Sequence, residues 1–352
     1  MESFVNTIDL LGDKATVEAI VSRTITEFND NVLTRIGEGT FYACDVLTSV
    51  NTPNVTSIGA YAFYKCSKLE SINFPNVTSI DDGGAFTYCS ALMNIDLPNV
   101  TSIGNSAFYA CNALTILDLR NVNMPKLTNI GIQAFYSCDA LTSVNMPNVT
   151  SVGTSAFSYC PALTSVDLPN VTNLGYSAFN WSKALTSVNI PKVTSISGYV
   201  FYGCNALTNI DLSNVTSIGD QGFGDCYSLT DIDLTNVTSI GKQAFYRCSK
   251  LTSINAPNAI SIADAAFYWC HGLTSINLPN VTSIGSEAFY YCEKLASLRL
   301  PATPPTLSNT NAFYRVPKTC VVYIPTGSLT EYQNATNWSS LTSTYSFVEE
   351  DR

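Results

Sequence analysis

The hydrophobic residues of this chain recur in a pattern that predicts a short strand followed by a turn. Leu163, Val166 and Leu168 follow the spacing Leu-x-x-Val-x-Leu, and Val166 and Leu168 alternate with polar residues, as in a β-strand. Pro169 ends this strand, because proline has no N–H to donate to the hydrogen-bond ladder of a sheet. Each strand is therefore expected to cover only a few residues.

A return segment follows each predicted strand. A valine such as Val171 begins it, and an Ile-Gly step such as Ile103-Gly104 or Ile240-Gly241 is expected to turn the chain, with glycine available for a positive φ. The sequence Ala-Phe-x-x-Cys then places Phe and Cys at i and i+3, on one side of a short helical turn. One strand and one return segment together make one coil.

This unit is repeated thirteen times along the chain. Its Phe falls at 41, 63, 86, 108, 135, 157, 179, 201, 223, 245, 267, 289 and 313, mostly 22 residues apart. The longer steps contain one extra residue within 81–84, five within 120–124, and a Pro-rich stretch at 301–305. A single coil cannot bury its own apolar residues, whereas stacked coils bury a continuous core, so the period predicts a solenoid.

The two ends differ from the repeats and are expected to cap the solenoid. We expect an N-terminal cap over 1–24, a solenoid of about 13 coils over 25–316, and a C-terminal cap over 317–352. In the first cap, Asp13 is placed to N-cap a short helix that runs to about Arg23. In the second, residues 320–325 predict a strand, and Ser328 is placed to N-cap a helix that runs to about Asn337.

Composition and charge exclude several classes of protein. Hydrophobic residues make up 46% of the 352 residues and charged residues 12%, so disorder is not expected. A net charge of −10 argues against binding to nucleic acid or to anionic membranes, which require basic surfaces. No apolar run is long enough to span a membrane. Residues 1–24 carry four acidic residues and no long apolar stretch, so no signal peptide is visible; either export takes another route or a leader has been removed.

The repeated pattern L-x-x-I-x-L-P-x-V-x-x-I-G-x-x-A-F-x-x-C resembles the BspA-like class of leucine-rich repeats over residues 25–316. The resemblance implies a right-handed, curved α/β-type solenoid, with a parallel sheet on its concave side and short helical or 3-10 turns on its convex side. It also implies a bacterial protein, typical of gut commensals, that is displayed on the cell surface or secreted. Several members of the class are adhesins. The class supplies no catalytic motif that might be carried over to these residues.

The polar row on the strand face is the first candidate site. The outward position after each strand Val or Ile, and the position two residues earlier, hold mainly Asn, Asp and Ser, and both are expected to lie on the concave surface. Charge is concentrated on adjacent coils, and the tentative binding residues are Asn209, Asp211, Asp231, Asp233, Asn255 and Arg299. The alternative is that these side chains hydrogen-bond along their own row and only keep the sheet soluble. Calcium has weak support, because the spacing matches no known calcium loop, and no metal is assigned.

An aromatic stripe on the return segment is the second candidate site. The residue just before the Cys position is aromatic in five coils, as Tyr88, Tyr159, Trp181, Trp269 and Tyr291. Exposed aromatic rings can stack on sugar rings or anchor a protein interface. The alternative is packing between neighbouring coils, because the aromatic residues recur irregularly.

The cysteines predict a buried row of free thiols. Eleven of the twelve occupy the same repeat position, where Ser182 and Val316 stand in two other coils, so the position favours a small buried residue. An odd set of eleven cannot pair completely, and no C-x-x-C pair suggests zinc. Cys320, outside the repeat, is either the most reactive thiol or a buried strand residue. The repeated Asn-Val-Thr sequons are interpreted as by-products of the turn.

These features favour a non-catalytic protein. The single histidine, His271, occupies a position that varies between coils and suggests an exposed residue, and no P-loop or H-E-x-x-H motif is present. Paired carboxylates such as Asp231 and Asp233 lie on an open row that offers no burial to raise a pKa, as a glycosidase would require. No cofactor is expected.

The preferred hypothesis is a recognition or adhesion module that binds a host or neighbouring-cell protein or glycan through the concave face, as a monomer without membrane insertion. A structural spacer, such as a phage-tail or cell-surface display component, is the alternative, because near-identical coils are not what a dedicated binding face usually shows. A carbohydrate-active enzyme is the third hypothesis.

Overall fold

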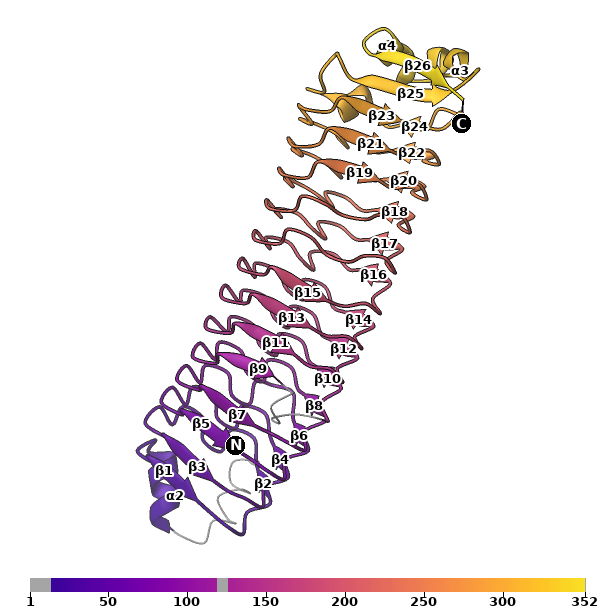
Figure 1. Cartoon of the computed structure of the whole chain (residues 1–352). Coiled ribbons are helices and arrows are strands. Elements are labelled where there is room, and N and C mark those ends of the chain that lie inside the picture. The colour runs from indigo at the N-terminus through magenta and orange to yellow at the C-terminus, as the bar shows by residue number, and fades with distance from the viewer. Residues whose placement is uncertain (1–13, 119–125, 352) are drawn as a thin grey trace. The chain divides into compact units, whose positions relative to one another are not determined.

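The computed structural model describes residues 14–118 and 126–351. It divides into two compact units, Met1–Ile190 and Pro191–Arg352, and within each unit short strands stack coil upon coil (Figure 1). All strand pairs are parallel, and the match of each strand to the repeat confirms a β-solenoid with little helix. Asp13, the predicted N-cap, and the insertion at 120–124 lie outside the described residues.

Most coils contribute strands to two separate rows rather than to the single row that the sequence predicts, and the coils that contain 209–211 and 231–233 contribute only to the second row. In the first unit the first row consists of β1 (Glu27–Asn29), β3 (Ser49–Asn51), β5 (Ser71–Asn73), β7 (Asn94–Asp96), β9 (Ile116–Asp118), β11 (Ser143–Asn145), β13 (Ser165–Asp167) and β15 (Ser187–Asn189). The second row consists of β2 (Arg35–Ile36), β4 (Ser57–Ile58), β6 (Ser79–Ile80), β8 (Ser102–Ile103), β10 (Asn129–Ile130), β12 (Ser151–Val152) and β14 (Asn173–Leu174). The Ser-Ile pair, whose isoleucine is also the first residue of the Ile-Gly step, is thus a separate strand.

The second unit has the same two rows and ends in a cap. Its first row contains β19 (Ser253–Asn255), β21 (Ser275–Asn277), β23 (Ser297–Arg299), β25 (Val321–Pro325) and β26 (Ser346–Glu350). Its second row contains β16 (Ser195–Ile196), β17 (Ser217–Ile218), β18 (Ser239–Ile240), β20 (Ser261–Ile262), β22 (Ser283–Ile284) and β24 (Thr306–Leu307). The helices of the described chain are α2 (Lys14–Val21), the 3-10 helix η2 (Thr310–Phe313), α3 (Leu329–Asn334) and α4 (Trp338–Thr342).

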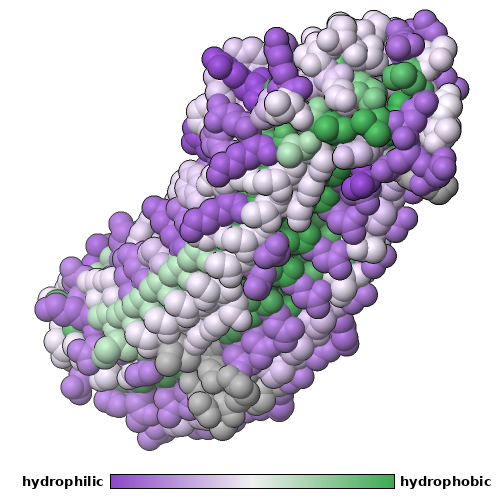
Figure 2. All heavy atoms as spheres, turned by 45° about the horizontal axis from the view of Figure 1, so that its top comes forward, coloured by the Kyte–Doolittle hydropathy of each residue, from purple (hydrophilic) through white to green (hydrophobic). Residues whose placement is uncertain are grey.

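The core of each unit is built from equivalent residues stacked in register. Val144 pairs with Val166 and Asn145 with Asp167, so every side chain lies next to its counterpart in the next coil. The repeat phenylalanines stack face to face, with centroids 5.0–5.6 Å apart from Phe41 to Phe179 and 5.3–5.6 Å apart from Phe201 to Phe313. On the face drawn in Figure 2, hydrophobic residues form bands between rows of hydrophilic ones.

The return segments are consecutive turns with i→i+3 bonds, in line with the predicted short helical or 3-10 turns, but most contain no continuous helix. Cys44 N–H donates to Phe41 O within the coil at 3.1 Å, whereas Phe41 N–H donates to Ala62 O of the next coil at 2.7 Å. Most residues two before and two after the repeat Phe have positive φ, as do Tyr61 at 53° and Lys65 at 61°. Among the described repeats, only the thirteenth contains a helix of any kind, η2. In the return segment, backbone hydrogen bonds within the coil alternate with backbone hydrogen bonds to the next coil. The next coil therefore supplies the acceptors for N–H groups that have no partner within their own coil.

The glycines of the Ile-Gly steps are required for close approach, not for the positive φ that the sequence suggested. Neither Gly104 nor Gly241 has a positive φ. A Cβ on Gly104 would come within 2.4 Å of Asp81 O in the preceding coil, and one on Gly241 within 2.7 Å of Gly219 C. Successive backbones therefore approach too closely at this turn for any side chain.

Polar residues that recur in the repeat form ladders of side-chain hydrogen bonds from coil to coil. Thr56 Oγ1 donates to Thr34 O at 3.1 Å, and Asn76 Nδ2 donates to Pro53 O at 2.8 Å. Equivalent bonds recur along both units. Because the sequon asparagines hold the turn of the preceding coil in this way, the repeated Asn-Val-Thr is explained by structure.

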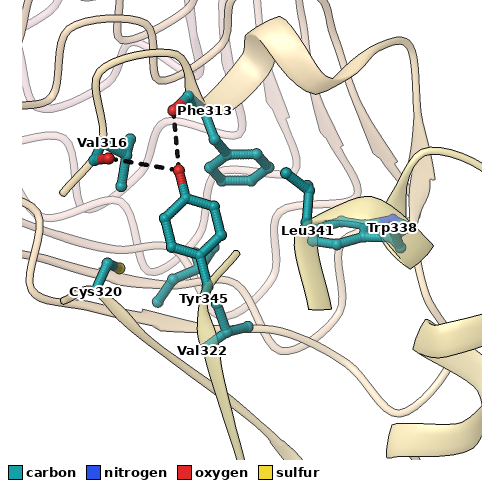
Figure 3. Close-up of a pocket in the computed structure, with 8 residues that line it drawn as sticks. Phe313, Val316, Cys320, Val322, Trp338, Leu341 and Tyr345 are labelled. Atoms are coloured by element: carbon teal, nitrogen blue, oxygen red, sulfur yellow. Dashed lines mark hydrogen bonds between the residues drawn. The ribbon is translucent and has the colours of Figure 1, made fainter. Parts of the chain in front are cut away.

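The C-terminal cap closes the open end of the second unit. Tyr345 Oη donates to Phe313 O at 3.1 Å, and both rings lie with Trp338 and Leu341 around a cavity of about 10 Å³ (Figure 3). Trp338 Nε1 donates to Pro305 O at 2.8 Å. Ser328 precedes α3 but its side chain makes no capping bond, and α3 ends at Asn334, short of the predicted Asn337. Helix α4 and the edge strand β26 were not predicted.

The phenylalanine stack is expected to dominate stability. Phe157 is fully buried between Phe135 and Phe179, so Phe157→Ala should lower the free energy of unfolding by about 3–5 kcal/mol through lost burial and a cavity. Urea denaturation followed by circular dichroism measures the change. Tyr176→Ala, at a side chain that is 50% exposed, is the matched control and should cost far less. Equal losses from both variants would contradict this account of the core.

Candidate functional site

The strand face places the predicted binding residues at the surface, but not all on strands. Asn255 lies on β19 and Arg299 on β23, both exposed. The segments that contain Asn209 and Asp211, and Asp231 and Asp233, have no strand assignment, although all four side chains are exposed. The predicted strand row is therefore interrupted in these two coils.

The interrupted coils share a substitution that engages their aspartates. Ser213 and Thr235 replace the proline that follows most first-row strands, so each has a free backbone N–H. Asp211 Oδ1 accepts from Ser213 N at 2.9 Å, and Asp233 Oδ1 accepts from Thr235 N at 2.9 Å and from Thr235 Oγ1 at 2.5 Å. The bonds from Thr235 lower the pKa of Asp233. Loss of the proline was the sequence signal for this local role.

Other members of the row bond to one another. Asn189 Nδ2 donates to Asp167 Oδ1 at 2.7 Å, and Asn277 Nδ2 donates to Asn255 Oδ1 at 2.8 Å. Arg299 Nε donates to Glu350 Oε1 of β26 at 3.1 Å. These bonds are what the solubilising alternative predicts, while the row as a whole still faces solvent.

The five aromatic residues before the Cys position all lie at the surface in left-handed turns. Their φ values lie between 56° and 63°, for Tyr88, Tyr159, Trp181, Trp269 and Tyr291. Tyr88 and Tyr159 are 42% and 43% exposed, and the other three are half-buried. A positive φ at a bulky residue is uncommon, and here the backbone N–H groups of Tyr88, Tyr159, Trp269 and Tyr291 donate to the next coil.

A second aromatic row beside this stripe was missed by the sequence interpretation. It is formed by the residue directly after the repeat Phe, and its members are Tyr42, Tyr64, Tyr109, Tyr136, Tyr202, Tyr246, Tyr268, Tyr290 and Tyr314. We call it the tyrosine ladder. Its rings stack where neighbours are present, at 4.9 Å for Tyr42–Tyr64 and 4.7 Å for both Tyr268–Tyr290 and Tyr290–Tyr314. The recurring Phe-Tyr pair in the repeat was the available signal.

Cationic side chains lie over these rings. The Arg247 guanidinium lies 4.6 Å from the Trp269 centroid and 5.0 Å from that of Tyr246, and Lys183 Nζ lies 5.1 Å from Trp181. Such contacts are favourable because the face of an aromatic ring carries negative potential. Several of the few basic residues of this acidic chain are therefore held on the return-segment side.

A hollow of about 240 Å³ opens in the second unit beside Arg247. It is lined by Tyr227, Arg247, Ser249, Trp269 and His271. Next to it the carboxylate of Asp225, 4% exposed, accepts from Tyr227 Oη at 2.9 Å. Burial is the main cause that raises the pKa of Tyr227, and the hydrogen bond to Asp225 is the second. His271 is half-exposed, with Nδ1 3.5 Å from Glu293 Oε2.

All twelve cysteines are free and buried, as predicted for the eleven of the repeat, and Cys320, for which two alternatives were open, is buried just before β25. The repeat position selects for more than size. Cys66 Sγ donates to Phe41 O of the preceding coil at 3.1 Å, and Ser182 Oγ makes the same bond to Phe157 O at 3.0 Å. Serine thus preserves the donor. Within the described residues, no three His, Cys, Asp or Glu side chains are placed to hold a metal ion.

The buried thiols predict loss of stability in alkali. Burial raises the pKa of Cys44 and of Cys320 to about 11 and of Cys160 to about 12, from an ordinary 9.0. Between pH 9 and these values the unfolded chain loses protons that the folded chain keeps, so stability falls as pH rises. Thermal unfolding from pH 7 to 11 should show a falling midpoint above about pH 9, and Ellman's reagent at pH 8 should label the twelve thiols rapidly only in denaturant. Rapid labelling of the folded protein would contradict the burial.

Comparison with known proteins identifies the repeat. A model of the BspA type leucine rich repeat region matches residues 21–124, 115–192, 172–265 and 260–347. The chain is similar to a leucine-rich repeat protein from Eubacterium ventriosum, with 22% identity over 87% of each chain and a TM-score of 0.50. It is also similar to one from Bacteroides ovatus, with 27% identity over 83% of this chain and 87% of that chain and a TM-score of 0.46.

A leucine rich cell surface protein from Faecalibacterium prausnitzii is 24% identical over 83% of each chain, with a TM-score of 0.36. A search of curated proteins returns no match. The Eubacterium ventriosum structure shares the solenoid fold, and the family model covers nearly all the coils described above. The chain therefore belongs to the BspA-type leucine-rich-repeat family.

Proposed function

We propose that this protein is a non-catalytic recognition or adhesion module that binds a protein or glycan partner through the first-row strand face. The observation that carries the proposal is the alignment of polar side chains at equivalent positions of successive coils, where most are exposed or half-exposed although Asn145 is buried. Leucine-rich repeats of this family are typical of protein-binding and adhesion modules, and a partner that spans several coils meets the same chemistry at each step.

The aspartates of the second unit give this face its charge. Asp211, Asp231 and Asp233 are exposed on neighbouring coils, and the hydrogen bonds from Thr235 favour the ionised form of Asp233. The turn bonds use Oδ1 of Asp211 and Asp233, so Oδ2 is the acceptor for a partner. A cationic patch on a protein or an amino group on a glycan complements such a row.

Display at the cell surface or secretion fits this function. The similar protein from Faecalibacterium prausnitzii is described as a cell surface protein, and the family resemblance points the same way. None of the helices in the described chain combines the length and the apolar character that a membrane span requires.

A structural spacer or display component is the second candidate. The side-chain ladders of Thr, Asn and Cys use polar groups to join coils, and several strand-face residues bond to one another. A solenoid whose polar groups hydrogen-bond between its own coils needs no binding partner along those coils.

An array of mucins, matrix proteins and glycans, probed with the labelled full chain, tests the proposal. The triple variant Asp211→Ala/Asp231→Ala/Asp233→Ala should lose a saturable signal at least about tenfold, because the charged face is removed. The matched triple Asn variant keeps the Oδ1 acceptor of each turn and should lose binding equally. Circular dichroism confirms that both fold.

The two variants separate charge from turn geometry. If the Asn variant binds like the unmodified chain while the Ala variant fails, the turns and not the carboxylate charges matter. If both variants retain every interaction, recognition through these residues is wrong. A chain that finds no partner on the array favours the spacer.

A further inference from the structure

Within the first unit the tyrosine ladder is replaced at Thr87, Ser158 and Asn180, and Thr87 is the replacement that lies between two stacked tyrosine pairs. Tyr42 and Tyr64 stack at 4.9 Å, and Tyr109 and Tyr136 stack at 4.8 Å, but the position between these pairs holds Thr87. Thr87 is 7% exposed, and its Oγ1 donates to Ser106 O at 2.7 Å. A ring is therefore missing at this point, and the small side chain that replaces it is held down.

The missing ring leaves a hollow of about 250 Å³ with aromatic walls. Its lining includes Tyr61, Tyr64, Tyr88 and Tyr109, and we call it the tyrosine hollow. Successive rings meet edge to face, at 78° for Tyr61–Tyr64, 84° for Tyr64–Tyr88 and 71° for Tyr88–Tyr109. The rings thus surround the space rather than filling it by stacking, and Tyr61 and Tyr88 are 44% and 42% exposed.

The backbone around the hollow explains why it stays open. The turn before Phe86 has one residue more than most repeats and carries Gly83 and Gly84, with φ of 103° and 69°. A Cβ on Gly84 would lie 2.4 Å from Thr87 Oγ1, so a side chain there would displace the threonine. Tyr61 and Tyr88 also have positive φ, and their N–H groups bond to Gly83 O at 3.0 Å and Tyr109 O at 2.8 Å in the next coil. The walls are consequently fixed by neighbouring coils before any ligand arrives.

The chemistry of the lining selects a neutral ligand that has both C–H faces and hydroxyls. The remaining lining side chains are Thr87, Ser106 and Gln133, and none of the lining residues carries a charge. Hydroxyl and amide groups both donate and accept hydrogen bonds, as sugar hydroxyls do, and ring faces pack against the C–H face of a pyranose. An organic cation is disfavoured because Lys65 Nζ already lies 5.4 Å from the Tyr64 centroid and 5.9 Å from that of Tyr88.

Size and surroundings indicate one sugar of a longer chain. The volume lies just below the roughly 300–1,000 Å³ of ordinary ligand pockets, which suits a single ring. A second, larger hollow of about 530 Å³ shares Tyr88 and extends along the coils past Ser67, Ser90 and Asn112, with Arg23, Asp45 and Lys65 also in its lining. An oligosaccharide with its terminal ring in the tyrosine hollow can continue over Tyr88 into this groove.

We propose that the tyrosine hollow binds the terminal ring of a neutral oligosaccharide. The inference rests on the recognition function proposed above but not on the strand face, from which it differs in residues and in chemistry. It places a glycan subsite on the return-segment side of the first unit.

The test is titration of the full chain by calorimetry with four neutral probes, namely maltohexaose, cellohexaose, mannohexaose and N,N′-hexaacetylchitohexaose. At least one should bind saturably with a dissociation constant of about 1 mM or tighter. Tyr88→Ala removes a shared wall and should weaken that binding at least about tenfold. Thr87→Tyr restores the side chain found in most other coils and should abolish binding by filling the hollow.

Controls keep the outcomes distinct. Tyr176→Ala removes an exposed tyrosine outside the hollow and should bind like the unmodified chain, and circular dichroism checks that every variant folds. No saturable binding by the unmodified chain to any of the four probes overturns the proposal. Binding that survives both Thr87→Tyr and Tyr88→Ala also overturns it. The triple Asp variant should bind these sugars normally, so failure of the strand face and failure of the hollow are separate results.

Discussion

The structure depends on one constraint, the in-register stacking of identical positions in successive coils. Backbone hydrogen bonds join each coil to the next in register. Every side chain therefore lies beside its own counterpart about 4.8 Å away. A residue is then favoured only if it packs well against copies of itself. Phenylalanine does so as an offset ring stack, threonine and asparagine as hydrogen-bond ladders, and cysteine as a thiol that donates to the coil before it.

This constraint explains why so much of the fold was predictable from sequence. The period of 22 residues and the strand around Val166 follow from spacing and alternation alone, although the strand ends at Asp167, before the predicted Leu168. The second row of strands was not predictable, because a two-residue Ser-Ile segment is too short to show any alternation of hydrophobic and polar residues. The reason for Gly104 was also mistaken, since a sequence does not show how closely the next backbone approaches.

The site was less predictable, because exposure and position do not reveal which polar atoms are already engaged. Asp211 and Asp233 were chosen for their charge, but each also holds a turn in place of a proline. The tyrosine ladder was missed for a different reason: its residues recur in most repeats, and the sequence does not show that their rings stack at the surface. Thr87 replaces one of these tyrosines between two stacked pairs, and only the structure shows that the replacement leaves a hollow.

The ends of the solenoid differ from its interior in the way that end groups differ from the monomers of a polymer. Each interior coil accepts hydrogen bonds from one neighbour and donates the equivalent bonds to the other. Strand β26, which contains Glu349 and Glu350, is the last strand of the first row. Duplicating or deleting a whole 22-residue unit therefore leaves every ladder complete and alters only the number of links. Length in such a protein is a quantity that recombination can adjust in single steps, while the cap must be kept whole.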